Sequence, residues 1–350
     1  MPASAAPDAS AGPYERAWTV SVASEGADTA GPIALAIATR VVILASENRP
    51  LEARSLEDGA VVWTSQAAIT APVVSEGLLV GVGGGELRAI GLEKGQPLWA
   101  VALGGATPGP SLVHDLVVVS SGAELRAYRT ADGAAVWRQT LPAPAARRPL
   151  GAGQLVIVAL TGSVVAAFDR GTGAAVWRTQ LDSAPSPMAA SADRIFFATA
   201  SGAVCALRVA DGRLSGCFRT APVPSAGAPV VQGSSVFFAL FDNTLRGFTA
   251  DGLTLTRLES LPARPALGPL RAGSHLAVPL ATSAFALAAI DAPAAVTVVS
   301  AFDKATGPVF KDAAAAPDGS WLVSLSTDPS ARLSLVGYRR KPAAVPSPNK

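Results

Sequence analysis

VVAAFDRGTGAAVWRTQL, residues 164–181, is the stretch from which the fold of this chain can be argued. Two runs of apolar and small residues, typical of β-strands, lie on either side of the turn-like segment Gly-Thr-Gly. Glycine accepts the positive φ that a tight hairpin requires. The stretch therefore predicts two antiparallel strands joined by a hairpin, with Trp177 four residues after Gly173.

Short apolar runs recur along the chain at the spacing of one such unit. Eight of them follow a turn-like pair, and their first residues, 37 to 45 positions apart, are Val41, Leu78, Leu116, Leu155, Ile195, Val236, Leu276 and Trp321. A proline, which suits the first residue of a strand, precedes seven of them: Pro32, Pro72, Pro110, Pro149, Pro187, Pro229 and Pro269. A period near 40 residues built from short strands is typical of β-propellers. The sequence predicts an all-β, eight-bladed β-propeller of four-stranded antiparallel blades.

The last unit lacks one strand, and the N-terminal segment offers a replacement. Residues 309–310, 321–326 and 333–338 supply three strands of the last blade. Residues 16–21, RAWTVS, precede the first full unit and carry Trp18. We expect this strand to complete the last blade, because closure removes an open sheet edge.

The domain organisation follows from this count. We predict a single propeller over residues 14–340, with flexible tails rich in Ala, Pro and Ser at residues 1–13 and 341–350. The start MPASAAPDASAGP has no basic residue and no apolar core, so it is not a secretory signal as it stands. Either the protein stays in the cytosol, or a signal has been removed.

Tryptophan occupies one position in four of the predicted blades. The segments DGAVVW, KGQPLW, DGAAVW and GTGAAVW place it four residues after a glycine, at Trp63, Trp99, Trp137 and Trp177. Because large rings fill the space between sheets, we expect these side chains and Trp18 to pack between neighbouring blades; a stacking platform for a ligand is the alternative. Later units depart from the pattern: four residues after Gly212 and Gly252 stand Gly216 and Thr256.

Two cysteines flank the turn at residues 210–212. If that turn has three residues, Val209 faces Arg213 and, counting back, Cys205 faces Cys217. Facing residues at a non-hydrogen-bonded position are close enough for a disulfide, which would imply an oxidising compartment such as the periplasm. A turn of two residues would break the pairing, so the sequence leaves both outcomes open.

Composition excludes several classes of function. Lys plus Arg is 28 against 26 Asp plus Glu, a net charge of +2, which argues against a strongly cationic nucleic-acid binder. The two His and two Cys are too few for the usual four-ligand zinc cluster. His114 and His275 lie at turns, and no Ser-His-Asp arrangement is recognisable. We therefore predict no catalytic, cofactor-binding or metal-binding residues.

The repeat resembles that of the pyrroloquinoline-quinone (PQQ) type β-propellers. Their pattern is an Ala-Xaa-Asp stretch, then Thr-Gly, then a Trp four residues after the Gly. It is matched here by Ala167, Asp169, Thr172, Gly173 and Trp177, and in part by residues 88–99 and 126–137. The resemblance covers residues 14–340 at the level of the repeat and implies the fold rather than an activity.

Two branches of that family differ in function. Quinoprotein dehydrogenases are longer enzymes that hold PQQ and a calcium ion in the central funnel, and many carry a disulfide between adjacent cysteines; this chain has no adjacent pair. The outer-membrane β-barrel assembly lipoproteins (BamB-like) are similar in size to this chain. Resemblance to them implies a scaffold with no catalysis and no cofactor, whose protein partner is the β-barrel insertase of the outer membrane.

We therefore expect a monomeric scaffold in the periplasm, on the inner face of the outer membrane, with a lipid anchor that this sequence does not contain. A cytoplasmic location, a PQQ-dependent enzyme and a small-ligand sensor are the alternatives. The loops expected to carry partner contacts, chosen for their length and composition, are residues 141–149 and 183–188.

Overall fold

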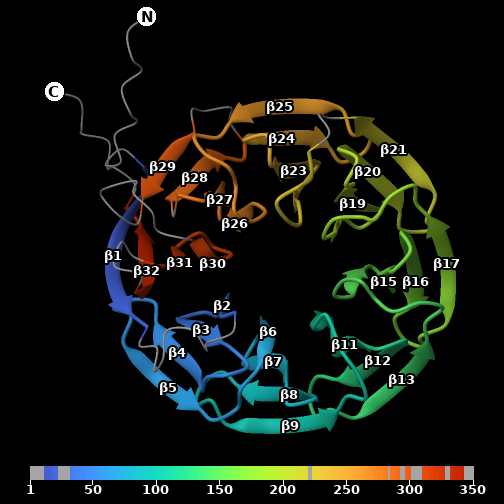
Figure 1. The fold of residues 1–350 in the computed structure, drawn as a ribbon, viewed down its shortest axis with the longest axis horizontal. Helices are drawn as coiled ribbons and strands as arrows, with labels where there is room; N and C mark the ends of the chain where they lie inside the picture. Colours follow the sequence, from blue (N-terminus) through green and yellow to red (C-terminus); the bar gives the residue numbers. More distant parts are fainter. Residues whose placement is uncertain are drawn as a thin grey trace, which may run out of the picture.

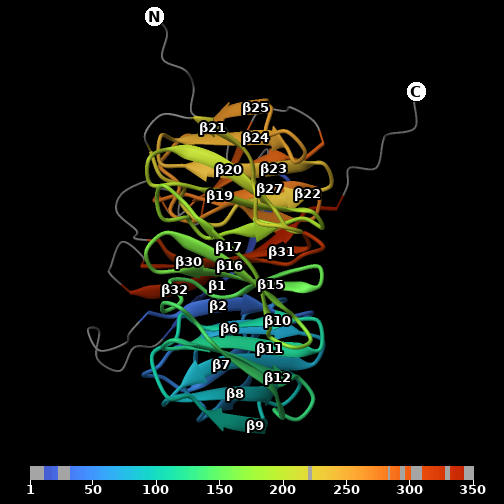
Figure 2. The ribbon, with the colours of Figure 1, turned by 90° about the vertical axis from the view of Figure 1, so that its right-hand side faces the viewer.

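Eight four-stranded antiparallel sheets stand around a common axis (Figure 1). The computed structural model describes residues 12–22, 32–219, 223–282, 284–291, 296–300, 310–327 and 332–342. Viewed from the side, the sheets form a disc (Figure 2). In these residues no helix is long and apolar enough to cross a bilayer. The predicted eight-bladed propeller is confirmed.

Blades 1 to 4 follow one another along the chain, each from its innermost to its outermost strand. Their strands are β2 (Ala34–Ile37), β3 (Val41–Ala45), β4 (Leu51–Ser55) and β5 (Val61–Ser65); β6 (Thr70–Ser75), β7 (Leu78–Gly83), β8 (Glu86–Gly91) and β9 (Pro97–Ala102); β10 (Pro110–Val113), β11 (Leu116–Ser121), β12 (Glu124–Arg129) and β13 (Ala135–Thr140); β14 (Leu150–Ala152), β15 (Leu155–Leu160), β16 (Val164–Asp169) and β17 (Ala175–Gln180).

Blades 5 to 8 continue the ring. Their strands are β18 (Ala189–Ala190), β19 (Arg194–Ala198), β20 (Ala203–Arg208) and β21 (Leu214–Arg219); β22 (Val230–Gln232), β23 (Ser235–Leu240), β24 (Thr244–Thr249) and β25 (Leu255–Ser260); β26 (Leu270–Ala272), β27 (His275–Pro279), β28 (Ala284–Ala289) and β29 (Thr297–Ser300); β30 (Phe310–Ala315), β31 (Trp321–Thr327), β32 (Leu333–Arg340) and, from the other end of the chain, β1 (Tyr14–Ser21).

The ring closes as predicted. Strand β1 pairs antiparallel with β32 as the outermost strand of blade 8, and Trp18 lies opposite Gly337. Just beyond the paired strands, the amide of Lys341 donates a hydrogen bond of 2.9 Å to the carbonyl of Pro13. The predicted strand residue Val309 falls outside the described residues, and β30 begins at Phe310.

The series of prolines marks the beginnings of the innermost strands. Pro110 is the first residue of β10, and Pro149, Pro229 and Pro269 directly precede β14, β22 and β26. At the start of a strand the missing amide proton breaks no ladder bond. Pro72, by contrast, is the third residue of β6, where the register with β7 is irregular.

The hydrophobic core is divided among the spaces between blades. One cluster combines Val118 and Leu125 of blade 3 with Val156 and Val158 of blade 4. The second strand of each blade is covered on both faces by its neighbours, so all six residues of β11 are buried. That double coverage explains why these strands appear in the sequence as continuous apolar runs instead of alternating ones.

Candidate binding site and the blade junctions

The outermost hairpin of a blade carries one extra residue. In blade 4, Ala167 faces Trp177 and Phe168 faces Ala175, which leaves Val176 as a bulge with half of its surface exposed. The same shift occurs between the third and fourth strands of blades 1 to 6. A bulge re-aims the residues around it, and here the residue after it is the repeated tryptophan.

Each of the five repeated tryptophans is hydrogen-bonded to the next blade. The Nε1 atoms of Trp18, Trp63, Trp99, Trp137 and Trp177 donate to the carbonyl oxygens of Leu56, Leu92, Thr130, Arg170 and Val209, at 2.6, 2.8, 2.9, 2.7 and 2.8 Å. The structure thus places these rings between neighbouring blades. Each indole fills apolar space and satisfies a carbonyl that no strand reaches.

Each ring also lies against a glycine of the next blade's hairpin. A methyl group at Gly173 would stand 2.5 Å from Cε3 of Trp137, and one at Gly133 would stand 2.7 Å from Cδ2 of Trp99. Both glycines have φ near +70°, so the hairpin requires glycine for its backbone as well as for the ring. A tryptophan on one blade and a glycine on the next form one unit, which we call the Trp–Gly junction.

Blade 6 departs from this pattern in a way that counting from Gly252 misses. The left-handed residue of its hairpin is Leu253, with φ of +51°, and the residue that faces Gly247 is Arg257. Arg257, not Thr256, is therefore the counterpart of Trp177. Its Nη1 donates to the carbonyls of Ala289 and Ile290 in blade 7, so the guanidinium makes the bond that indole makes elsewhere.

The junction between blades 5 and 6 has the small and large residues exchanged. Gly216 stands at the tryptophan position of blade 5, and a methyl group there would meet nothing within 4 Å. Leu253 stands at the glycine position of blade 6, where its side chain is 5% exposed within the cluster that fills this junction. The apolar volume therefore comes from the other blade.

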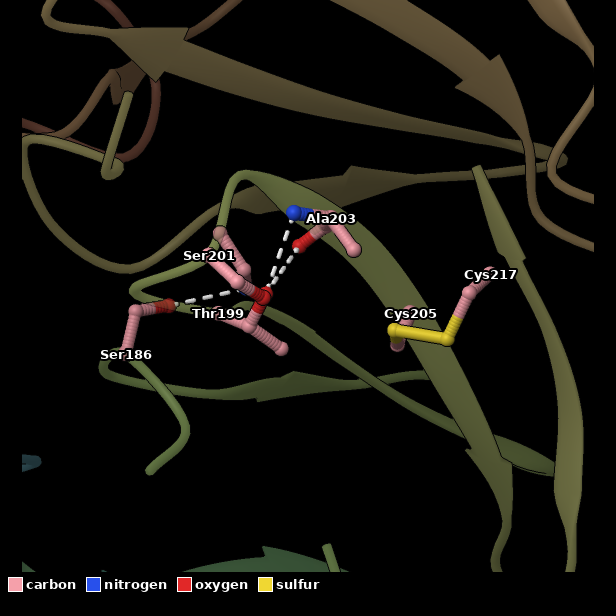
Figure 3. The surroundings of a disulfide bond; sticks show 7 residues. Ser186, Thr199, Ser201, Ala203, Cys205 and Cys217 are labelled. Carbon is pink, nitrogen blue, oxygen red and sulfur yellow. Dashed lines mark hydrogen bonds between the residues drawn. A yellow bond between two sulfur atoms is a disulfide. The ribbon is translucent and has the colours of Figure 1, made fainter. Parts of the chain in front are cut away.

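The cysteines of blade 5 are joined as a disulfide (Figure 3). Cys205 on β20 faces Cys217 on β21, with Cα atoms 4.1 Å apart. The predicted turn is wrong in one respect: Leu207 faces Leu214, and the amide of Arg208 donates to the carbonyl of Arg213, so Val209 belongs to a four-residue turn. The bulge at Ser215 offsets the extra turn residue, and the two cysteines again face each other.

The loops at residues 141–149 and 183–188 are more regular than their composition suggested. Each runs from the outermost strand of one blade to the innermost strand of the next. The amide of Ala146 donates to the carbonyl of Ala159 at 2.8 Å, and that of Ser186 to Ala198 at 2.7 Å. Equivalent bonds recur in blades 6 and 7, so in blades 4 to 7 these connections are a repeated motif held to the second strand of the blade.

Both loops line a cavity of about 440 Å³ beside the innermost strands of blades 3 to 6. We call it the axial cavity; its lining residues are Pro108, Ser111, Ala146, Arg147, Arg148, Pro149, Leu150, Pro187, Met188 and Ala228. All of them lie at or just before the start of an innermost strand, on the same end of the ring. The hydroxyl of Ser111 donates to the carbonyl of Pro149 at 2.5 Å and fixes blade 4 against blade 3 there.

Arg148 provides the partly buried charge of the axial cavity. Its side chain extends from blade 4 onto blade 3, where a methyl group at Gly109 would lie 3.0 Å from its Nε. Burial lowers the pKa of Arg148, and the opposite charge of Asp312, on β30 of blade 8, acts against that shift. Burial also raises the pKa of Asp312, against the hydrogen bonds that its carboxylate accepts from the amides of Leu35 and Ala313 at 2.7 and 2.8 Å.

A second hollow lies on the outer wall of the ring. It is an open groove of about 400 Å³ between the outer strands of blades 2 and 3, lined by Val101, Arg126, Val136, Trp137 and Arg138 among others. Arg126 and Arg138 both form salt bridges with the carboxylate of Glu124, so both guanidinium groups are paired and the three side chains keep a net charge of +1. The charged side chains of this groove are therefore paired within the protein, and the rest of its lining is mainly apolar.

The acidic and imidazole groups do not converge. Within the described ranges no group of three or more His, Cys, Asp and Glu residues is placed to hold a metal ion. The nitrogen Nδ1 of His275 lies 3.1 Å from the hydroxyl of Ser274. Burial, with the nearby charge of Arg340, lowers the pKa of His275.

Comparison with known proteins gives a family and several structural neighbours. The family model described as outer membrane protein assembly factor BamB matches residues 83–311. No curated protein sequence matches the chain closely.

Three solved structures share the fold at low identity. BamB from Moraxella catarrhalis has 16% identity and a TM-score of 0.67, over 94% of this chain and 98% of that one. The computationally designed protein Ika8 has 14% identity and a TM-score of 0.73, over 91% and 98%. A quinohemoprotein alcohol dehydrogenase from Pseudomonas putida HK5 has 14% identity and a TM-score of 0.60, over 97% and 78%.

The last likeness raises the question whether the residues present would fit PQQ and its calcium ion. The repeated tryptophans lie in the outermost strands, and the disulfide joins non-adjacent cysteines of the two outer strands of blade 5. The axial cavity offers two arginines and no carboxylate among its lining residues. This donor set suits a carboxylate but not a calcium ion, so it does not fit the cofactor with its metal.

Proposed function

Because the chain belongs to the family of the outer membrane protein assembly factor BamB, we propose that it is a non-enzymatic scaffold in the assembly of outer-membrane β-barrel proteins. The observation that carries this proposal is the match of the family model over residues 83–311, which run from the end of β7 into β30. In this role the protein binds a partner protein and catalyses no reaction itself.

The geometry suits a scaffold. Eight blades are locked into a ring by β1 and by the side chains at their junctions, so surface loops keep fixed relative positions. The repeated connections at residues 141–149 and 183–188 lie at one end of that ring. Arg147 is exposed on the first connection, and Asp182 is exposed directly before the second. Binding residues are commonly carried on loops that a rigid framework positions. We place the partner contact on these two connections.

The disulfide supports the proposed location. Disulfides form and persist in oxidising compartments and are rare in the cytosol, and blade 5 holds its two outer strands together with one. We therefore place the protein in the periplasm, at the inner face of the outer membrane, with the β-barrel insertase as its partner.

An affinity capture tests the proposal. The tagged full chain is incubated with solubilised outer membranes of the source organism, and the captured proteins are identified by mass spectrometry. We expect a large β-barrel insertase among them, in a stable ratio to the bait. If no insertase is recovered while the bait remains folded, the assembly role is wrong.

Charge reversal locates the contact. Arg147→Glu alters an exposed side chain on the first connection and Asp182→Arg one directly before the second, and both should reduce capture at least tenfold without changing the melting temperature. Arg178→Glu, an exposed position on the outer strand β17, is the matched control and should capture the insertase as the wild type does. An equal loss of insertase capture in all three variants would show that the contact does not lie on these loops.

A further inference from the structure

We propose that the axial cavity binds a small organic carboxylate with an apolar body, and that Arg148 receives the carboxylate. The cavity is lined by the same two connections on which the partner contact is proposed, but the ligand proposal does not rest on that function. A cavity of about 440 Å³ has room for one such molecule.

The charge of Arg148 is only partly compensated inside the protein. Neither a hydrogen bond nor a salt bridge joins its guanidinium to another of the described residues. The opposite charge that acts on Arg148 is that of Asp312, whose carboxylate already accepts hydrogen bonds from two backbone amides. A partly desolvated guanidinium without a bonded partner is costly, and a bidentate carboxylate is the ligand that fits its planar donors best.

The backbone next to Arg148 is held against blade 3. Gly109 lacks the side chain that would meet Arg148, and its φ of +111° is a backbone conformation that residues with side chains rarely adopt. On the other side, the hydrogen bond from Ser111 to the carbonyl of Pro149 holds the segment that carries Arg148. A backbone already held in place reduces the conformational freedom that is lost when a ligand binds.

The remaining walls select the body of the ligand. Pro108, Pro149, Leu150, Pro187 and Met188 give the cavity an apolar lining, while Arg147 stands exposed at its rim. A strongly hydrated inorganic anion would not suit the apolar lining, and a neutral hydrocarbon would not pair with the charge of Arg148. A carboxylate joined to an aliphatic or aromatic group would.

The chain contains a natural reporter for this site. Methionine occurs twice in the sequence, as Met1 and Met188, and Met188 lines the cavity. Labelling with ¹³C-methyl methionine therefore gives a spectrum of at most two methyl signals, and Met188→Leu assigns the one from the cavity. The full chain is titrated with 4-phenylbutyrate and, separately, with its neutral amide, 4-phenylbutanamide.

We expect 4-phenylbutyrate to shift the Met188 signal saturably, and at least tenfold more tightly than the amide. Arg148→Gln should abolish that preference, while Arg148→Lys, which keeps the charge, should retain part of it. Arg178→Gln on the outer wall is the control and should bind as the wild type does. The melting temperature of each variant shows whether it is folded.

Three results would overturn the proposal: no saturable shift with 4-phenylbutyrate, equal affinity for acid and amide, or an unchanged preference in folded Arg148→Gln. Because the readout is a ligand-induced shift in the isolated chain, it succeeds or fails independently of insertase capture.

Discussion

The junction between blades 4 and 5 and the junction between blades 5 and 6 fill the same space from opposite sides. At the first, Trp177 of blade 4 lies against Gly212 of blade 5 and bonds the carbonyl of Val209. At the second, blade 5 offers Gly216 and blade 6 offers Leu253, which is buried at the glycine position. A large apolar side chain therefore occupies each junction, from blade 4 in the first and from blade 6 in the second, as close packing between sheets requires.

Tryptophan contributes a hydrogen bond to its junction in addition to apolar volume. Indole satisfies a carbonyl of the next blade, whereas Leu253 has no donor. The corresponding carbonyl of blade 6 is that of Ala250, and among the described residues no side chain donates to it. Blade 5, which lacks the tryptophan, has a disulfide between its own two outer strands. The two junctions therefore divide packing and hydrogen bonding differently.

The largest expected effect is at the ring closure. Trp18 is 9% exposed, joins β1 to blade 1 through Leu56, and lies against Gly337 of β32. Trp18→Ala should lower the free energy of unfolding by about 3–5 kcal/mol, since a large cavity opens where the chain ends meet. Urea unfolding measures it. Trp99→Ala, at an internal junction with a half-buried ring, should cost less; an equal cost would contradict a special role for closure.

The Trp–Gly junction can be broken from its glycine side. Gly173→Ala should cost about 2–4 kcal/mol, because the left-handed backbone costs about 1–2 kcal/mol and the methyl group overpacks against Trp137. Gly122→Ala is the matched control: φ is +59° and a methyl group there meets nothing within 4 Å, so only the backbone cost remains. Thermal unfolding should separate the two variants, and equal losses would remove the ring from the explanation.

The disulfide should matter where tryptophan is missing. Cys205→Ala with Cys217→Ala frees a loop with a sequence separation of 12 residues, for which the loss is about 2–3 kcal/mol. Dithiothreitol should lower the melting temperature of the wild type and leave that of the double variant unchanged. If dithiothreitol lowered the melting temperature of both proteins, the loss of stability would not come from the disulfide.

The smallest effect concerns the acidic turn of blade 4. The hydroxyl and amide of Thr172 donate to Asp169 at 2.7 and 2.9 Å, and these bonds, with a weaker one from Gly171, lower the pKa of Asp169. A lowered pKa gives stability that is present above the pKa of the unfolded chain, about 4, and is lost as pH falls through the folded value. Asp169→Asn should flatten the acid side of the melting curve against pH by a small amount. An unchanged slope would contradict this assignment.

Much of the fold could be predicted because its signals are local and repeated. The period near 40 residues, the hairpin glycines and the unpaired strand at residues 16–21 lead to eight blades and to the closure that β1 makes. Continuous apolar runs such as that of β11 mark strands covered on both faces. Each signal comes from backbone geometry or burial, which every blade shares.

The departures could not be predicted in the same way because they depend on pairing across strands. Counting from Gly252 points to Thr256, whereas aligning Phe248 with Phe168 would have identified Arg257 as the counterpart of Trp177. A non-glycine residue at positive φ, as at Leu253, carries no signal in one sequence. Arg148 likewise looks like an ordinary surface arginine until the loops of four blades meet around it.

The exchange of large and small residues between blades 5 and 6 is tested most directly by a double-mutant cycle of Gly216→Trp and Leu253→Gly. Each single variant should destabilise, the first because Leu253 already fills the junction and the second because nothing would. The double variant restores a Trp–Gly junction, so its loss in the free energy of unfolding should be smaller than the sum of the single losses by about 1–3 kcal/mol. Additivity within about 0.5 kcal/mol would contradict the exchange and show that the two positions do not share one space.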